Sequence, residues 1–261
     1  ERERMLTLQK LFYSLFTTQF FIAAVAVLLS IETSIVLHQP FQSFCFYFFT
    51  FFATHFAYNI YYIKTQSGQL HKMLASISFI ASILILFFVP QLWHPKLLFI
   101  ALPSAMYILP IFFNFGMNRG FRFFKLLLLI FVWVATTFVL PISKLSYQAS
   151  MIVLLFYRIV LLSFACILFF IRDEYDQDLK RIASVAAWIL LLLQFILAAL
   201  VTSTIDIEVG ICYLGICILN IVLGYRFLKT KQPNLQYQMF VDGVLFLQGF
   251  IVTIIYFIEL S

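Results

Sequence analysis

The sequence has little charge for its length. Only 11% of its 261 residues are charged, with 17 Lys and Arg against 11 Asp and Glu, whereas 64% are hydrophobic. Soluble domains carry about a quarter charged residues. Water-soluble enzymes, nucleic-acid-binding proteins and disordered chains all need far more polar surface than this composition supplies. The scarcity of charge therefore predicts an integral membrane protein without a nucleic-acid partner.

Cysteine is also scarce, and its positions exclude two kinds of site. The chain has four cysteines, Cys45, Cys166, Cys212 and Cys217, all within apolar stretches, where a thiol behaves as a small hydrophobic group. Cys212 and Cys217 do not have the CxxC spacing of a metal-binding or redox pair. The sequence predicts neither a disulfide framework nor a zinc site.

Long apolar runs occupy most of the chain. A transmembrane helix needs about 20 mostly apolar residues, and breaks at charged, proline and glycine residues leave nine such segments. They lie near 11–37, 41–63, 73–89, 96–114, 123–141, 147–171, 183–203, 207–228 and 238–259. The runs do not alternate as barrel strands do, and the first is too long for a signal-peptide core. We predict an all-α fold in which residues 1–261 form one domain of nine transmembrane helices.

The basic residues predict the orientation of these helices. Fourteen of the 17 lie in segments that share one side of the membrane if the N-terminus does, namely Arg2, Arg4, Lys10, Lys64, Lys72, Arg119, Arg122, Lys125, Arg172, Lys180, Arg181, Arg226, Lys229 and Lys231. The opposite side has only Lys96 and Lys144. By the positive-inside rule, the N-terminus is cytoplasmic and the C-terminus lies across the membrane, which we expect to be a bacterial inner membrane.

The densest polar cluster follows the sixth apolar segment. Four of the 11 acids lie between Asp173 and Asp178. If a helix continues through them, Asp173 and Asp176 share one face, and clustered carboxylates suit Mg²⁺ bridged to phosphate. The alternative is a solvated loop whose acids are neutralised by Arg172, Lys180 and Arg181.

A second polar cluster ends the second apolar segment. His55 and Asn59 are four residues apart, and therefore share a helical face. They are candidates for binding a ligand. The alternative is hydrogen bonding between helices, which is common in membrane bundles.

One cation lies inside an apolar segment. Arg158 is 14 residues before Arg172, about 21 Å along a helix, so it belongs in the bundle interior with an acceptor or an anionic ligand. Glu32, Asp242 or backbone carbonyls are the structural alternatives. Lys125, like its neighbouring basic residues, either binds phosphate or only sets the topology.

In this pattern the chain resembles the UbiA superfamily of intramembrane prenyltransferases, which have nine helices, a cytoplasmic N-terminus and Asp-rich motifs ending the second and sixth helices. The resemblance rests on Tyr58-Asn59, on Ile171-Arg172-Asp173 with Asp176, and on the segment from Phe124-Lys125-Leu126 through Val132-Trp133 to Leu140-Pro141. It implies an all-α bundle around a central cavity that opens to the cytoplasm. It also implies that Asn59 and Asp173 meet at the cap of that cavity.

The resemblance implies transfer of a prenyl group from its diphosphate, with Mg²⁺ neutralising the leaving pyrophosphate. Asp173, Asp176 and Asp178 would hold the metal. The residues that would bind the substrate are His55, Asn59, Lys125, Arg158, Arg172 and Lys180. The partners expected are a membrane lipid or isoprenoid and the proteins of a larger complex.

The chain departs from the family at both motifs. Ile63 and Ser67 stand where the first motif has Asp, and Phe170 and Gln177 stand at Asp positions of the second. These changes favour a non-catalytic membrane subunit or a lipid- or isoprenoid-binding scaffold. An Mg²⁺-dependent prenyltransferase and a transporter are the alternatives.

Overall fold

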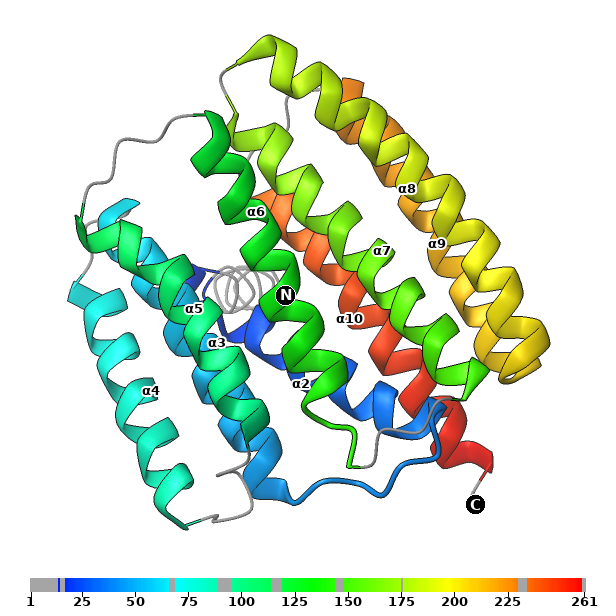
Figure 1. The fold of residues 1–261 in the computed structure, drawn as a ribbon, viewed down its shortest axis with the longest axis horizontal. Helices are drawn as coiled ribbons and strands as arrows, with labels where there is room; N and C mark the ends of the chain where they lie inside the picture. Colours follow the sequence, from blue (N-terminus) through cyan, green and yellow to red (C-terminus); the bar gives the residue numbers. More distant parts are fainter. Residues whose placement is uncertain are drawn as a thin grey trace, which may run out of the picture. The chain divides into compact units, whose positions relative to one another are not determined.

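The computed structural model describes residues 14, 17–65, 69–88, 95–113, 119–143, 148–174, 176–229 and 234–259. The described residues form helices and no strand (Figure 1). The helices are α2 (Phe20–Val36), α3 (Phe44–Thr65), α4 (Gln69–Phe88), α5 (Pro95–Phe113), α6 (Arg119–Val134) with the π-helical segment η2 (Ala135–Val139), α7 (Ala149–Asp173), α8 (Gln177–Thr204), α9 (Ile207–Lys229) and α10 (Asn234–Glu259). The predicted all-α class is confirmed.

Six helical segments of the described chain are long and apolar enough to cross a membrane. They are Gln69–Phe88, Arg122–Val139, Ala149–Asp173, Gln177–Thr204, Ile207–Leu228 and Met239–Glu259. Two shorter apolar helices are Phe20–Val36 and Pro95–Ile108. Helix α3 has 22 residues, but its tyrosines, His55 and Asn59 lower its hydropathy. An integral membrane protein is thus supported, while the count of nine membrane crossings and the orientation of the termini stay predictions.

The first apolar segment was predicted as one helix over 11–37, and this is wrong at its start. A turn at Thr18 and Gln19 precedes α2, and Gln19 has a left-handed backbone with φ of 65°. This conformation ends the helical turn in which the Thr18 amide donates to the Ser14 carbonyl, because few side chains tolerate continuing it. Residues 11–13, 15 and 16 lie outside the described part.

The other end of α2 is closed by its own backbone. His38 has φ of 49°, its amide donates to the Ile35 carbonyl, and the Gln39 amide donates to the Ser34 carbonyl at 2.8 Å. This is the Schellman pattern, with His38 at the position that glycine usually occupies. Pro40 follows and cannot continue the helix.

The chain folds as two compact units. The first comprises residues 1–27 and 42–115 and the second residues 28–41 and 116–261, so one domain over 1–261 stays a prediction. In the first unit, α3 packs against α4 and α5. Its core there is made by Ile60 and Ala75, with Phe56, Tyr61, Ile63 and Ile108 around them.

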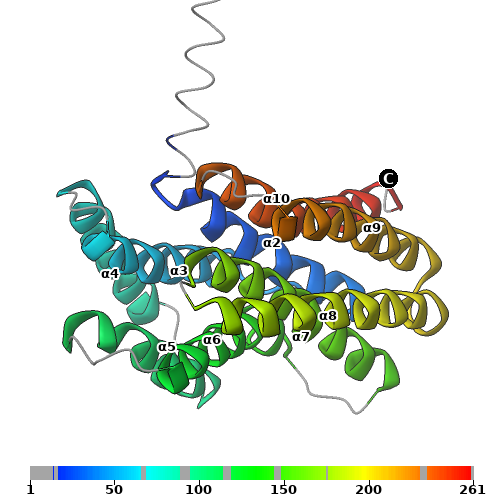
Figure 2. The same ribbon diagram turned by 90° about the horizontal axis from the view of Figure 1, so that it is seen from above.

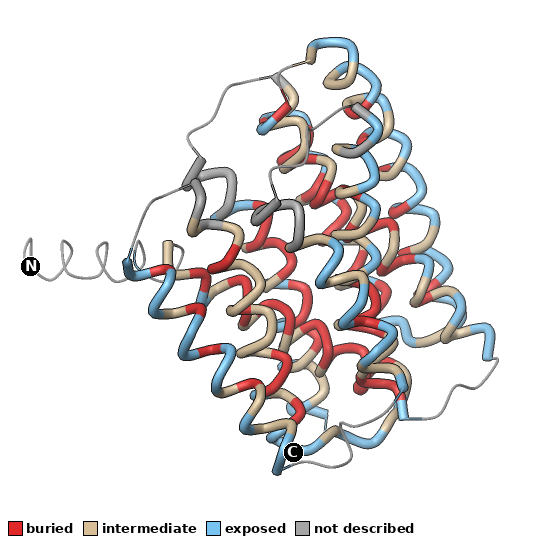
Figure 3. Tube along the Cα trace, turned by 60° about the vertical axis from the view of Figure 1, so that its left-hand side comes forward, coloured by how far each residue is buried: buried red, intermediate tan, exposed pale blue. Residues whose placement is uncertain are grey.

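In the second unit, α7 is the most buried of the membrane-length helices. It contacts α6, α8 and α10, while α9 packs between α8 and α10. Helices α8 and α9 run side by side in both ribbon views (Figures 1 and 2). Buried and exposed residues alternate along individual helices (Figure 3), which is the pattern of helices that bury one face.

The corner between α8 and α9 requires a glycine. A Cβ added to Gly210 would lie 2.1 Å from the Thr202 Oγ1 and 2.4 Å from its Cα, so any side chain would force the two helices apart. Asp206 begins α9 by accepting hydrogen bonds from the amides of Glu208 and Val209 at 2.7 and 3.2 Å. The short connection is therefore fixed by one cap and one close approach.

Candidate functional site

His55 and Asn59 meet one backbone oxygen in the first unit. The His55 Nε2 lies 2.8 Å from the Thr18 carbonyl oxygen and the Asn59 Nδ2 lies 3.3 Å from it. A carbonyl only accepts, so His55 carries a proton on Nε2. The break at Gln19 leaves the Thr18 carbonyl without the helical partner that a continuous helix would supply. The two side chains of α3 satisfy this carbonyl.

Both side chains also contact α4. The His71 Nδ1 lies 2.7 Å from the Asn59 Oδ1, and the His55 Nδ1 lies 2.7 Å from the Ser78 Oγ. All four side chains are buried, and Asn59 has no exposed surface. We call Thr18, His55, Asn59, His71 and Ser78 the imidazole–amide cluster.

Aromatic rings cover the imidazole of His55. The Phe51 ring is parallel to it, with an interplanar angle of 8° and centroids 5.9 Å apart, and the Phe20 ring centroid lies 4.4 Å away. Water is thus kept from the ring, and its hydrogen bonds act in a low-dielectric environment that strengthens them. For His55 and Asn59, the sequence analysis considered ligand binding and hydrogen bonding between helices. The contacts of both side chains are of the second kind.

Sequence reasoning found two members of this cluster and missed three. His71 and Ser78 are seven residues apart on α4, so they share a helical face. This spacing could have identified both residues from the sequence. The predicted third segment began at 73 and left His71 outside it. Thr18 had no signal, because it takes part through its backbone.

The acids between α7 and α8 do not share a helical face. Helix α7 ends at Asp173, Glu174 is extended, and α8 begins at Gln177. The expectation that Asp173 and Asp176 stack on one continuing helix is therefore wrong. The physical reason is that Asp176 caps α8: its Oδ1 accepts from the amides of Asp178 and Leu179 at 3.0 and 3.3 Å, a role for which Asp is favoured.

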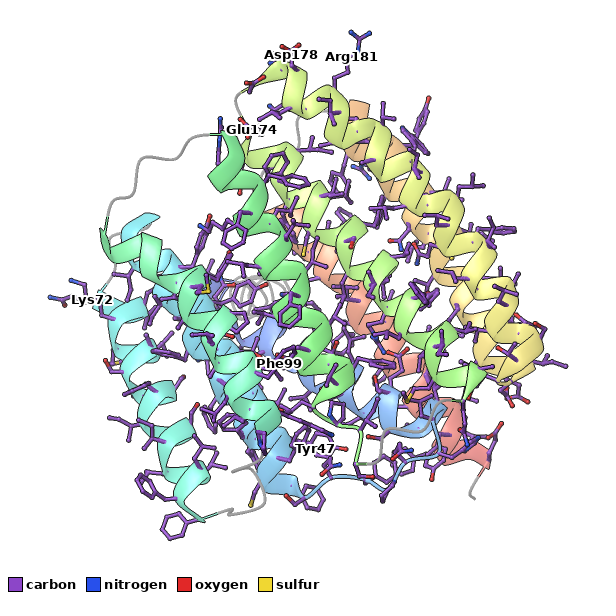
Figure 4. The ribbon with its side chains drawn as sticks, viewed as in Figure 1. Tyr47, Lys72, Phe99, Glu174, Asp178 and Arg181 are labelled. Atoms are coloured by element: carbon purple, nitrogen blue, oxygen red, sulfur yellow. The ribbon has the colours of Figure 1, made fainter. Side chains whose placement is uncertain are left out.

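Arginine side chains hold the two acids that end α7. The Arg172 Nε and Nη2 donate to the two carboxylate oxygens of Asp173 at 2.6 and 2.8 Å. The Arg122 Nη1 donates to the Glu174 Oε1 at 2.5 Å, and the same oxygen accepts from the Asp176 amide at 2.9 Å. Figure 4 shows Glu174 beside the upper end of α6 and Asp178 and Arg181 at the start of α8, where Arg181 points outward. Sequence reasoning anticipated neutralisation by Arg172 and missed Arg122.

We call residues 172–178 with Arg122 the α7–α8 junction. At this junction Asp173 accepts hydrogen bonds at both carboxylate oxygens, and Asp176 caps α8. No group of three or more His, Cys, Asp or Glu within the described residues is placed to hold a metal ion. The metal roles of Asp173, Asp176 and Asp178 therefore stay predictions.

The two lysines proposed for substrate binding lie near this junction. Lys125 on α6 is attracted electrostatically by Asp173. Lys180, in the first turn of α8, donates its backbone amide to the Asp176 carbonyl. Both side chains are half-buried. Their binding of a diphosphate stays a prediction.

Arg158 forms a buried ion pair in the second unit. Its Nη2 lies 3.0 Å from the Glu32 Oε2, and neither side chain has exposed surface. The same nitrogen lies 3.4 Å from the Leu29 carbonyl oxygen and 3.3 Å from the Thr33 Oγ1. Glu32 and a backbone carbonyl are two of the partners that the sequence suggested. The Arg158 Nε and Nη1 are buried without a hydrogen-bond partner among the residues that the structure describes.

Neutral side chains extend this pair across the unit. Glu32 accepts from the Tyr213 hydroxyl and, at 2.7 Å, from the Gln248 Nε2. Tyr157 donates to Gln248 at 3.2 Å and accepts from the Gln194 Nε2 at 3.3 Å. We call Glu32, Arg158, Tyr213, Gln248, Tyr157 and Gln194 the ion-pair cluster. Its members come from α2, α7, α8, α9 and α10.

The π-helical segment lies beside the ion-pair cluster. Thr33 donates from its Oγ1 to the Thr137 carbonyl at 2.8 Å, and the Leu140 amide donates to the Ala135 carbonyl. A π-turn widens the helix and shifts its carbonyls out of the α-helical register, which lets the Thr137 carbonyl accept from α2. Apart from Arg158 and its suggested partner Glu32, we had no prediction for the members of the ion-pair cluster, because single buried Gln and Tyr residues lack a spacing signal.

The described chain is thus an all-helical protein with segments long enough to cross a membrane, with two buried polar clusters and a partly exposed polar junction between α7 and α8. No family model matches the chain, and searches of curated proteins and of solved structures gave no match. Asn59 belongs to the first unit and Asp173 to the second. Their meeting at one cap, and the UbiA-like fold that requires it, stay predictions.

Proposed function

We propose that the protein is a non-catalytic membrane subunit that binds a lipid or isoprenoid chain and serves as a scaffold within a larger complex. The observation that carries the proposal is that both polar motifs are engaged in structural contacts. Asp173 is bound by Arg172, and Asp176 caps α8. Asn59 is engaged through both its amide nitrogen and its oxygen.

A diphosphate with Mg²⁺ would need carboxylate oxygens that are available to the metal. To bind at Asp173, the ion would have to displace the two hydrogen bonds that the Arg172 guanidinium donates to that carboxylate. Recruiting Asp176 would remove the cap of α8. Recruiting Asn59 would leave the buried Thr18 carbonyl and His71 with fewer partners, which is costly.

Apolar surface supports the scaffold part of the proposal. Helix α8 exposes a series of large apolar side chains, namely Ile182, Val185, Ile189, Leu192, Leu193, Phe195 and Ile196. Lipid acyl chains, isoprenoid chains and the apolar helices of a partner can all cover such a face within a membrane. We therefore assign lipid- or isoprenoid-binding, not chemistry at the α7–α8 junction, as the function.

The test is release of pyrophosphate by the purified full-length chain. Prenyl diphosphates of several lengths are supplied with Mg²⁺ and lipophilic aromatic acceptors, and we expect no release above background. Asp173→Asn with Asp176→Asn is compared with Asp206→Asn, an N-cap at the start of α9. Mg²⁺-dependent release that is lost only in the Asp173/Asp176 variant would overturn the proposal in favour of a prenyltransferase.

A second experiment tests the scaffold directly. The protein is purified in mild detergent and photolabelled with a benzophenone-bearing isoprenoid alcohol, which carries no diphosphate. We expect saturable labelling within the helices that is competed by unlabelled isoprenoid alcohol. Labelling that does not saturate would contradict a binding role.

A further inference from the structure

The second unit contains two buried acids within its helices, and their surroundings differ. Glu32 accepts hydrogen bonds from Tyr213 and Gln248 and pairs with Arg158. Asp242 lies in the membrane-length segment Met239–Glu259 of α10 with 7% of its surface exposed. Within the described part of the chain, no hydrogen bond and no ion pair reaches its carboxyl group. One buried acid has dedicated partners and the other does not.

No charged group of the described chain lies within ion-pair distance of the Asp242 carboxyl group. On α7, Cys166 and Arg172 are the groups that act on it electrostatically. Arg172 donates two hydrogen bonds to Asp173 and lies over the Phe169 ring. On α9, the guanidinium of Arg226 lies 5.6 Å from the centre of the Phe240 ring. An ionised Asp242 would therefore be a buried charge without a dedicated partner in the described chain, an arrangement that proteins avoid by neutralising the group.

We propose that Asp242 is a proton-binding site, whose carboxyl group is held as the neutral acid within α10. The protein takes up this proton when its helices assemble and loses it when the helices separate and water reaches the side chain. Glu32 is the matched contrast, because Tyr213, Gln248 and Arg158 all contact its carboxyl group. The site does not depend on the proposed scaffold function.

Infrared spectroscopy of the purified protein near neutral pH tests this proposal. The carbonyl stretch of a protonated acid is separate from the bands of a carboxylate. We expect the difference between the wild-type protein and Asp242→Asn to show loss of one protonated-acid band. Glu32→Gln, the matched control, should retain that band. Loss of carboxylate bands in Asp242→Asn would overturn the proposal.

Chemical modification of the unaltered protein provides a measurement that needs no variant to fold. Dicyclohexylcarbodiimide is lipid-soluble and reacts with a protonated carboxyl group: the acid proton moves to one nitrogen, the carboxylate oxygen bonds to the central carbon, and an acyl shift to nitrogen gives a stable N-acylurea. We expect the adduct at Asp242 in peptide mass spectra, with at least tenfold less at Glu32. Equal modification of both acids, or none at Asp242, would overturn the proposal.

Discussion

The imidazole–amide cluster and the ion-pair cluster satisfy buried polar side chains in different ways. Both place polar side chains at buried positions of apolar helices. The first uses neutral groups only and satisfies a carbonyl that a backbone break exposes. The second buries a full positive and a full negative charge with no exposed surface. The difference teaches that hydrogen bonding alone supports a broken helix, whereas an ionised pair needs several helices around it.

The energetic consequences of the two solutions should also differ. Removing one member of a neutral network leaves a buried donor or acceptor unsatisfied, which costs about 1–3 kcal/mol. Removing one member of a buried ion pair leaves a charge in a low-dielectric interior, which costs about 3–5 kcal/mol. Four predictions, in order of decreasing effect, test this contrast and compare it with the α7–α8 junction.

The largest effect is expected at the ion pair. Arg158→Leu leaves Glu32 charged and buried, so we expect a loss of about 3–5 kcal/mol in the free energy of unfolding, measured by denaturant titration in detergent micelles. Adding Glu32→Leu to this variant should recover most of the loss, because both charges are then absent. Arg181→Leu, at an exposed arginine of α8, is the control. A loss at Arg158 no greater than that at Arg181 would refute the contrast.

A smaller loss is expected in the imidazole–amide cluster. Asn59→Ala removes the acceptor of His71 and a donor to Thr18, so stability should fall by about 1–3 kcal/mol. Ser78→Ala and Ser76→Ala form a matched pair on α4, since Ser78 is buried against His55 and Ser76 is exposed. Only Ser78→Ala should destabilise the protein. Equal values for the two serines would argue against a cooperative cluster.

The next largest loss of stability is expected at the N-cap of α8. Asp176→Ala removes the acceptor of the Asp178 and Leu179 amides and should cost about 1 kcal/mol, while Asp176→Asn should cost only a few tenths because Asn is also a favourable cap. Thermal unfolding measured by circular dichroism separates the two. If Asn is as damaging as Ala, charge and not capping is the role of Asp176.

The smallest effect is expected at the exposed pair of Arg172 and Asp173. Half of the Asp173 side chain, 52%, is exposed, and water screens such pairs, so Arg172→Gln should change the unfolding free energy by about 0–1 kcal/mol. Molar salt should weaken this pair and leave the buried pair of Arg158 unaffected. A large salt dependence that persists in Arg172→Gln would place the sensitive charges elsewhere.

Much of the fold followed from local sequence properties. Each predicted apolar segment overlaps a helix of the described chain, because burying the backbone in apolar surroundings requires internal hydrogen bonds whatever the neighbours are. The ends were less predictable. The helix expected over 11–37 is interrupted at Gln19 by a left-handed backbone, and the acids after Asp173 begin a new helix. The interruption at Gln19 and the start of α8 both depend on hydrogen bonds to particular side chains, which the sequence does not specify.

The candidate sites were also only partly predictable from the sequence. His55, Asn59 and Arg158 stood out as polar residues in apolar surroundings, and the structure gives all three buried hydrogen bonds or ion pairs. Glu32 and a backbone carbonyl had been named as possible partners of Arg158, but the other partners did not stand out in the sequence. Gln248 is 216 residues from Glu32, and no local spacing relates residues so far apart.

The sequence by itself determined an all-helical chain rich in apolar segments, because composition and run length decide whether backbone and side chains can be buried in an apolar environment. Only the tertiary structure decided what the polar residues do. It pairs Glu32 with Arg158, gives Asp176 to the start of α8, and leaves Asp242 without a partner among the described residues. A polar group in an apolar interior is governed by the few atoms within hydrogen-bond distance, and packing alone selects those atoms.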